Sequence, residues 1–91
     1  MAFSIAYNPR FIRLSERFLR HHPELRTQLA QAVRELEMEP FPARLRVHAL
    51  AGRQIGLYAA SVTTSYRVVF RMQPAERRIE LMDIGSHEVY G

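Results

Sequence analysis

Cysteine, tryptophan and lysine are all absent from the 91-residue sequence, and it has no long apolar run. Without cysteine there can be no disulfide framework, no cysteine-ligated zinc site and no thiol nucleophile. No apolar stretch approaches the roughly 18 residues that a transmembrane helix needs, and the first ten residues lack the pattern of a secretory signal. We therefore expect a cytoplasmic protein without a membrane span.

Apolar residues make up 47% of the chain, enough for a single modest core. At this length residues 1–91 are predicted to form one domain. All 13 basic residues are arginine and they outnumber the 9 acidic residues, so the net charge is +4. The planar fork of arginine matches phosphate oxygens two at a time. A modest basic excess favours a nucleic acid or an acidic protein as partner and does not decide between them.

The first half of the sequence predicts a short strand followed by two helices. Residues 3–7 alternate weakly, as a strand does. The dipeptide Asn8-Pro9 is a helix-start signal, and apolar residues at helical spacing continue to about His21. A second helix is predicted to begin at Pro23, and a proline-rich segment ends it.

The second half of the sequence predicts a run of strands. They are expected at residues 54–62, 65–72 and 79–84, with Gly85 ending the last one. Short connections between successive strands predict an antiparallel three-strand meander. A sheet with a helix pair on one face is an α+β domain.

Four arginines recur at helical spacing within the first predicted helix. They lie within about 80° of one another, opposite the apolar face. The arginine ridge, as this group is called below, consists of Arg10, Arg13, Arg17 and Arg20. It is interpreted either as a phosphate-binding surface for a structured RNA or as an ordinary solvated helix face.

Candidate catalytic residues lie in the second half. Because side chains alternate along residues 65–72, Arg67 lies on the face opposite Tyr66. An arginine within an apolar strand is costly unless it is paired or faces an open concavity. With His48 and His87 it would supply the base, acid and cation needed to cleave RNA through the ribose 2′-OH, without a metal.

A resemblance to a known family lies in residues 48–90. The segments there read, in order, HAL-x-G, G-x-Y, YRVVF, IELMDIG and SHEVYG. Together they resemble the RelE/ParE superfamily, the toxins of bacterial type II toxin–antitoxin pairs, whose small fold has the same order of strand, helix pair and sheet. The resemblance implies an endoribonuclease that cuts messenger RNA on the ribosome by 2′-OH attack, with no cofactor. For the ParE branch it implies an inhibitor of DNA gyrase instead.

The resemblance also implies roles for individual residues. Arg67 takes the place of the arginine that stabilises the transition state in RelE-like nucleases. His48 and His87 take the places of catalytic histidines in the YafQ-like branch. Tyr90 lies near the terminal aromatic residue of that branch, and either it or Tyr66 would stack on an exposed base.

The implied partners are a cognate antitoxin, the ribosome and messenger RNA. Arg53 would help Arg67 to bind phosphate, and the arginine ridge would hold ribosomal RNA. The antitoxin is expected to dock on the helix pair and the sheet edge through an acidic, amphipathic segment that folds on binding, giving a toxin–antitoxin hetero-oligomer.

The YafQ-like pattern is incomplete in this sequence, because Ser61 and Ser65 stand where that branch has a further histidine and an aspartate. The departure favours a second hypothesis, a non-catalytic binding module such as a gyrase inhibitor or an inactive toxin. The structural alternatives are a loop position for His48, a salt bridge from Arg67 to Glu80 or Asp83, a backbone-bound imidazole for His87 and a core-edge position for Tyr90.

Overall fold

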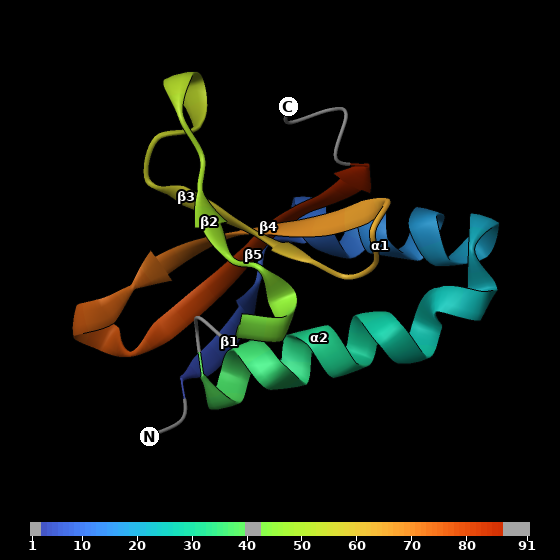
Figure 1. Ribbon diagram of the computed structural model, residues 1–91, viewed down its shortest axis with the longest axis horizontal. Helices are drawn as coiled ribbons and strands as arrows, with labels where there is room; N and C mark the ends of the chain where they lie inside the picture. Colours follow the sequence, from blue (N-terminus) through green and yellow to red (C-terminus); the bar gives the residue numbers. More distant parts are fainter. Residues whose placement is uncertain (1–2, 40–42, 87–91) are drawn as a thin grey trace.

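The structure is a computed structural model that describes residues 3–39 and 43–86. Two helices and a sheet are joined by short 3₁₀ turns (Figure 1). In chain order the elements are β1 (Ser4–Tyr7), α1 (Pro9–His21), η1 (Pro23–Leu25), α2 (Arg26–Met38), η2 (Ala43–Leu45), β2 (His48–Ala49), η3 (Gly52–Gln54), β3 (Leu57–Ser61), β4 (Tyr66–Gln73), η4 (Pro74–Glu76) and β5 (Arg78–Ser86). None of the helices in the two described stretches has the length and apolar composition that a bilayer crossing requires.

The first helix begins and ends where the sequence predicts. Asn8 is its N-cap, and the side-chain oxygen of Asn8 accepts a hydrogen bond from the backbone N–H of Arg10 at 2.9 Å. This bond satisfies one of the backbone N–H groups in the first turn, which have no partner within the helix. Pro9 stands at the start of the helix, where its missing N–H is not needed.

The second helix begins one turn later than predicted. Pro23 starts the 3₁₀ turn η1 rather than α2, and the backbone N–H of Leu25 donates to the carbonyl of His22 at 3.0 Å. The tighter turn forms the corner between the two helices, so α2 begins at Arg26.

A five-stranded sheet in the order β1-β5-β4-β3-β2 forms the rest of the fold. β3, β4 and β5 are the predicted antiparallel meander. Two edge strands extend it: β1 pairs in parallel with β5, and the two-residue β2 pairs antiparallel with β3. The predicted α+β fold, with its N-terminal strand and its meander, is therefore confirmed, and the unpredicted β2 completes a five-stranded sheet.

The strand expected from residue 54 begins only at Leu57. Gly52 and Gly56 have positive φ angles of 69° and 91° in the preceding loop. These left-handed angles suit glycine and lie outside the region that strands use. The segment before Leu57 is therefore a loop, which the backbone bond from Leu50 N–H to the Leu57 carbonyl closes at 2.9 Å.

The last strand is longer than predicted, because β5 continues through Gly85 to Ser86. Gly85 pairs with Arg67 of β4, and Ser86 pairs with Tyr66. The added length extends the sheet alongside the start of β4, where the candidate arginine lies.

Alternation along β4 directs successive side chains to opposite faces of the sheet. Phe70 belongs to the main core, to which both helices contribute. Val69 packs instead in a small cluster with Leu50 and Ala59. Arg67, two residues before Val69, therefore lies on the face opposite the helices, as the sequence predicts.

Candidate functional site

Arg67 is only 2% exposed, and it is the single buried charged or polar residue in the described part of the chain. On either side of β4 its Cα faces those of Ser61 on β3 and Gly85 on β5. These neighbours are small, so they leave room on that face for a long side chain. Arginine cannot lose its charge in a protein, so the fold holds a permanent cation within its interior.

The imidazole of His48 contacts the guanidinium of Arg67. Nη1 of Arg67 lies 3.5 Å from Nε2 of His48, while Nδ1 of His48 lies 3.2 Å from the carbonyl oxygen of Arg46. A guanidinium can only donate and a carbonyl can only accept. Both contacts are satisfied when the imidazole is neutral, with the proton on Nδ1 and the lone pair on Nε2. The structure thus brings together two of the predicted catalytic residues, through a contact between an imidazole and a guanidinium.

The backbone before β2 orients this histidine. Arg46 has a φ angle of 51°, in the left-handed region that non-glycine residues seldom adopt. The turn at Arg46 leads into β2, where His48 pairs with Ala59 of β3. The carbonyl oxygen of Arg46 is thereby held 3.2 Å from Nδ1 of His48.

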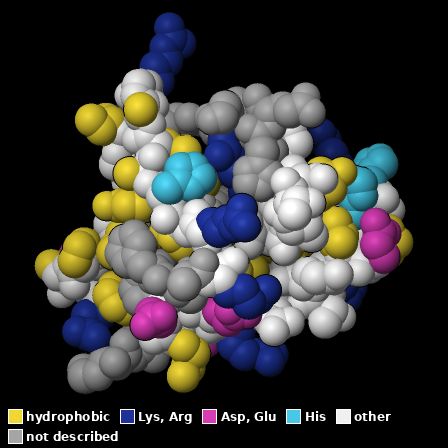
Figure 2. All heavy atoms as spheres, viewed as in Figure 1, with side chains coloured by type: hydrophobic (Ala, Val, Ile, Leu, Met, Phe, Trp, Pro, Cys, Tyr) yellow, Lys and Arg dark blue, Asp and Glu magenta, His cyan; other side chains and the backbone are white. Residues whose placement is uncertain are grey.

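A groove of about 570 Å³ opens beside His48, within the usual size range of ligand sites, about 300–1,000 Å³. One wall comes from the segment that leads into β2, and the other from the end of β3 and the turn after it. The lining residues are Arg44, Arg46, His48, Ser61, Val62, Thr63 and Thr64. Acidic side chains are absent from this set of described residues, and in Figure 2 basic side chains and a histidine lie close together near the centre of the visible face.

Arg44 is held at the rim of this groove by Glu35 of α2. Nε of Arg44 donates to Oε1 of Glu35 at 3.0 Å, and Nη2 donates to Oε2. These hydrogen bonds, more than the charge of the guanidinium, lower the pKa of the Glu35 carboxyl below its usual value. The same bonds raise the pKa of Arg44.

The variant Arg44→Gln should return the pKa of Glu35 toward the ordinary value of about 4.3 for a glutamate. Because the folded-state pKa is lowered, the pair stabilises the fold above that ordinary value and loses this contribution as pH falls through the lowered one. An NMR titration of the side-chain carboxyl carbon measures the change. Identical titration curves in the two proteins would contradict the ion pair.

Tyr66 lies away from the pair formed by His48 and Arg67. Its ring makes an edge contact with Phe18, with centroids 5.0 Å apart, and its hydroxyl lies 3.3 Å from Nε2 of His22. Tyr66 therefore belongs to an aromatic cluster with the first helix. Alternation along β4 had already separated Tyr66 from Arg67.

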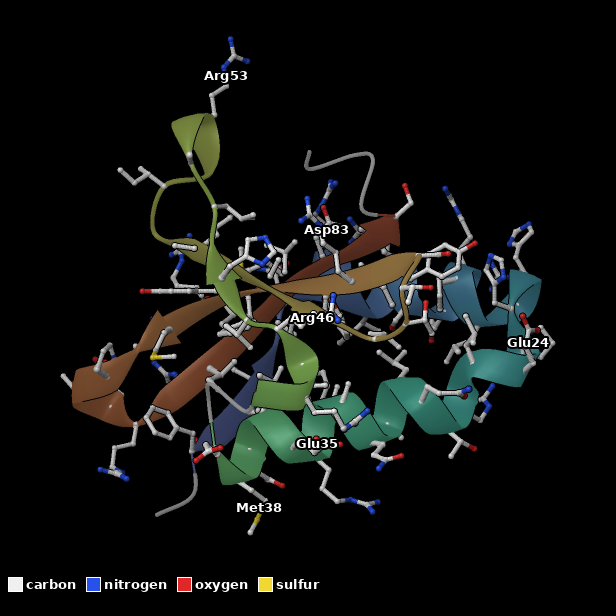
Figure 3. The ribbon with its side chains drawn as sticks, in the orientation of Figure 1. Glu24, Glu35, Met38, Arg46, Arg53 and Asp83 are labelled. Carbon is white, nitrogen blue, oxygen red and sulfur yellow. The ribbon has the colours of Figure 1, made fainter. Side chains whose placement is uncertain are left out.

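The other predicted RNA-binding residues are also spread over the surface. All four arginines of the ridge are exposed on α1, and Arg10 makes an ion pair with Asp83 at 3.5 Å. Figure 3 shows Arg53 at the tip of the η3 loop, pointing away from the sheet and from Arg46. The structure does not bring Arg53 to Arg67. The remaining predicted site residues, His87 and Tyr90, lie outside the described residues.

Reasoning from the sequence missed Arg44 and Arg46. The available signal was their spacing, because two arginines and His48 follow one another at intervals of two residues. No group of three or more histidine, cysteine, aspartate or glutamate side chains in residues 3–39 and 43–86 is arranged to hold a metal ion.

The sequence matches no protein-family model and no curated protein. Solved structures match over most of the chain. A metal-bound toxin from Helicobacter pylori is 20% identical, with a TM-score of 0.80 and full coverage of both chains. A YoeB/ParE toxin from Agrobacterium tumefaciens is 18% identical, with a TM-score of 0.78 over 93% of this chain and 99% of the other.

A third similar structure is the toxin–antitoxin complex DinJ-YafQ from Escherichia coli. Its matching chain is 18% identical, with a TM-score of 0.78 over 98% of this chain and 97% of that one. An archaeal RelE-RelB complex from Pyrococcus horikoshii shares the fold as well, with a TM-score of 0.73 at 20% identity. The resemblance drawn from the sequence is thereby confirmed at the level of structure: the chain has the fold of the RelE/ParE toxins.

Proposed function

We propose that the protein is the toxin of a toxin–antitoxin pair and cleaves messenger RNA on the ribosome through attack by the ribose 2′-OH. The contact between His48 Nε2 and Arg67 Nη1, 3.5 Å apart beside a basic groove, carries this proposal. The imidazole nitrogen that would accept a proton and the guanidinium that would bind a phosphate are close enough to contact the same nucleotide.

In this proposal Nε2 of His48 accepts the proton of the 2′-OH. The 2′ oxygen then bonds to the adjacent phosphorus, and the bond from phosphorus to the 5′ oxygen breaks. Arg67 stabilises the negative charge that develops on the phosphoryl oxygens, and burial strengthens that interaction. The leaving oxygen needs a proton, which is one of the two roles predicted for His87, general acid or general base. The products are a 2′,3′-cyclic phosphate and a 5′-hydroxyl end.

The length of the contact between His48 and Arg67 suits such an exchange. A hydrogen bond of 3.5 Å is at the weak end of the range, so little is lost when each group turns to a substrate atom instead.

An antitoxin, the ribosome and messenger RNA are the partners in this proposal, and the cytoplasm is the place where they meet. The fold shared with the toxin of the DinJ-YafQ complex supports a protein partner. The exposed arginines on α1 supply a surface that ribosomal RNA or an acidic antitoxin segment can bind.

The second candidate, a binding module without catalysis, is favoured by Ser61. This residue pairs with Arg67 and lines the groove, at a position where the YafQ-like branch has a histidine. A hydroxyl there cannot act as a general acid or base near neutral pH.

Induced expression in bacteria separates the two candidates. The nuclease should arrest growth within minutes and cut transcripts inside their reading frames, leaving 5′-hydroxyl ends that ligation-based sequencing detects. A binding module of the gyrase-inhibiting kind should arrest growth with intact transcripts and a DNA-damage response. Normal growth with intact transcripts, at an expression level confirmed by immunoblot, would contradict both.

A further inference from the structure

We infer that Arg44 and Arg46 form a second phosphate-binding position, which holds the backbone of single-stranded RNA next to the phosphate that is cleaved. The inference rests on the proposed function, because RNA is taken as the substrate. It adds how the strand is held in the groove, through residues that lie outside the pair formed by His48 and Arg67.

One edge of the Arg44 guanidinium is hydrogen-bonded to Glu35, and the other edge can bind a ligand. Glu35 accepts from Nε and Nη2 of Arg44, while Nη1 of Arg44 makes no hydrogen bond to any described residue. A guanidinium has five N–H donors in a flat fork, so the edge formed by Nη1 and Nη2 can still bind two oxygens of a phosphate. Glu35 holds the fork in place from the α2 side, which reduces the entropy lost on binding.

Arg46 contributes both its backbone carbonyl and its side chain to the groove. Its carbonyl oxygen orients His48, and its exposed side chain lines the groove two residues before that histidine. Figure 3 shows Arg46 near the middle of the molecule, in front of the crossing strands. The groove wall therefore presents two cations in sequence, followed by the imidazole.

The opposite wall suits an anion as well. Ser61 and Thr64 line it with hydroxyl groups, and Glu35, the carboxylate bonded to Arg44, lies outside the described lining residues. An acidic peptide could also satisfy two guanidinium groups. RNA is favoured because the groove continues to His48, whose Nε2 lone pair and cationic neighbour Arg67 suit a ribose 2′-OH and its phosphate.

The test measures binding of a fluorescein-labelled 2′-O-methyl oligonucleotide, which cannot be cleaved by this chemistry, to the full-length protein. The variants are Arg44→Gln and Arg46→Gly. Glycine adopts the left-handed angle of position 46 without strain, so the carbonyl that orients His48 is retained while the cation is lost. Arg78→Gln is the matched control, since it removes the same charge at the far end of β5.

Each groove variant should weaken binding roughly fivefold to tenfold, and each should reduce the slope of log affinity against log salt by about 0.7. The double variant should reduce that slope by about 1.4. The control Arg78→Gln should bind with nearly the wild-type affinity and slope. Groove variants that bind like the control, with unfolding temperatures like the wild type, overturn the inference.

Two further outcomes keep this inference separate from the proposed function. If the wild-type protein cuts no RNA but binds it with the expected variant effects, the binding position stands and the nuclease proposal fails. If an octaglutamate peptide binds as tightly as the oligonucleotide and loses affinity in the same variants, the groove is a site for an acidic peptide and the inference is wrong.

Discussion

Arg67→Lys should lower the rate of RNA cleavage about 10²- to 10³-fold, the typical effect of removing one preorganised donor from a developing oxyanion. Lysine keeps the positive charge but replaces the flat fork with a single ammonium group, so it cannot bind two phosphoryl oxygens in parallel. The buried position makes the substitution more severe, because water does not compensate for a lost donor there.

Cleavage of a defined messenger RNA in a purified translation reaction measures this effect, with wild-type and variant proteins at equal concentration. Because Arg67 is buried, thermal unfolding must be measured on the same samples, and the rates compared well below the lower midpoint. Arg67→Met is a second variant, in which an apolar side chain of similar length removes the guanidinium and its charge together. Two folded variants that cleave within about threefold of wild type would exclude Arg67 from the chemistry.

His48→Ala should lower the cleavage rate about 10²- to 10⁴-fold, as expected when a general base is removed. The side chain is exposed, so the free energy of unfolding should change by no more than about 0.5 kcal/mol. The same translation reaction measures the rate, and added imidazole should restore part of it by replacing the missing base.

His21→Ala is the matched control for His48. Both residues are exposed histidines whose Nδ1 lies near a backbone carbonyl oxygen, that of Arg17 at 2.9 Å in the case of His21. His21 lies on α1, however, and has no contact with Arg67. Equal losses of activity in both variants, or none in either, would show that the imidazole of position 48 has no special role.

The elements with strong local signals were predictable from the sequence. The Asn8-Pro9 signal placed the start of α1 because the cap is a contact between residues close in sequence. The β-branched residues of β4 identified that strand and its two faces. The strand β2 and the pairing partner of β1 were beyond such reasoning. β2 has only two residues, too few for any periodicity, and the parallel pairing of β1 with β5 joins residues more than 70 positions apart.

The candidate site, like the fold, was predictable from the sequence only in part. The proximity of His48 and Arg67 was expected because the family resemblance places both in one catalytic site. The two walls of the groove were not predicted, because they come from segments that meet only through the pairing of β2 with β3. Tyr66 contacts Phe18 and His22 on the face opposite Arg67, and its role in base stacking stays a prediction.

His48 and Arg67, the proposed catalytic pair, lie on strands that differ in how easily they open locally. Arg67 lies on β4, which has a hydrogen-bonded neighbour on each side, whereas His48 lies on a two-residue strand at the margin, paired with β3 alone among the described strands. Short marginal strands fray at a small fraction of the free energy that global unfolding requires. The imidazole can therefore swing out while the guanidinium stays fixed, so any ligand that clamps the margin would govern how often the pair is assembled.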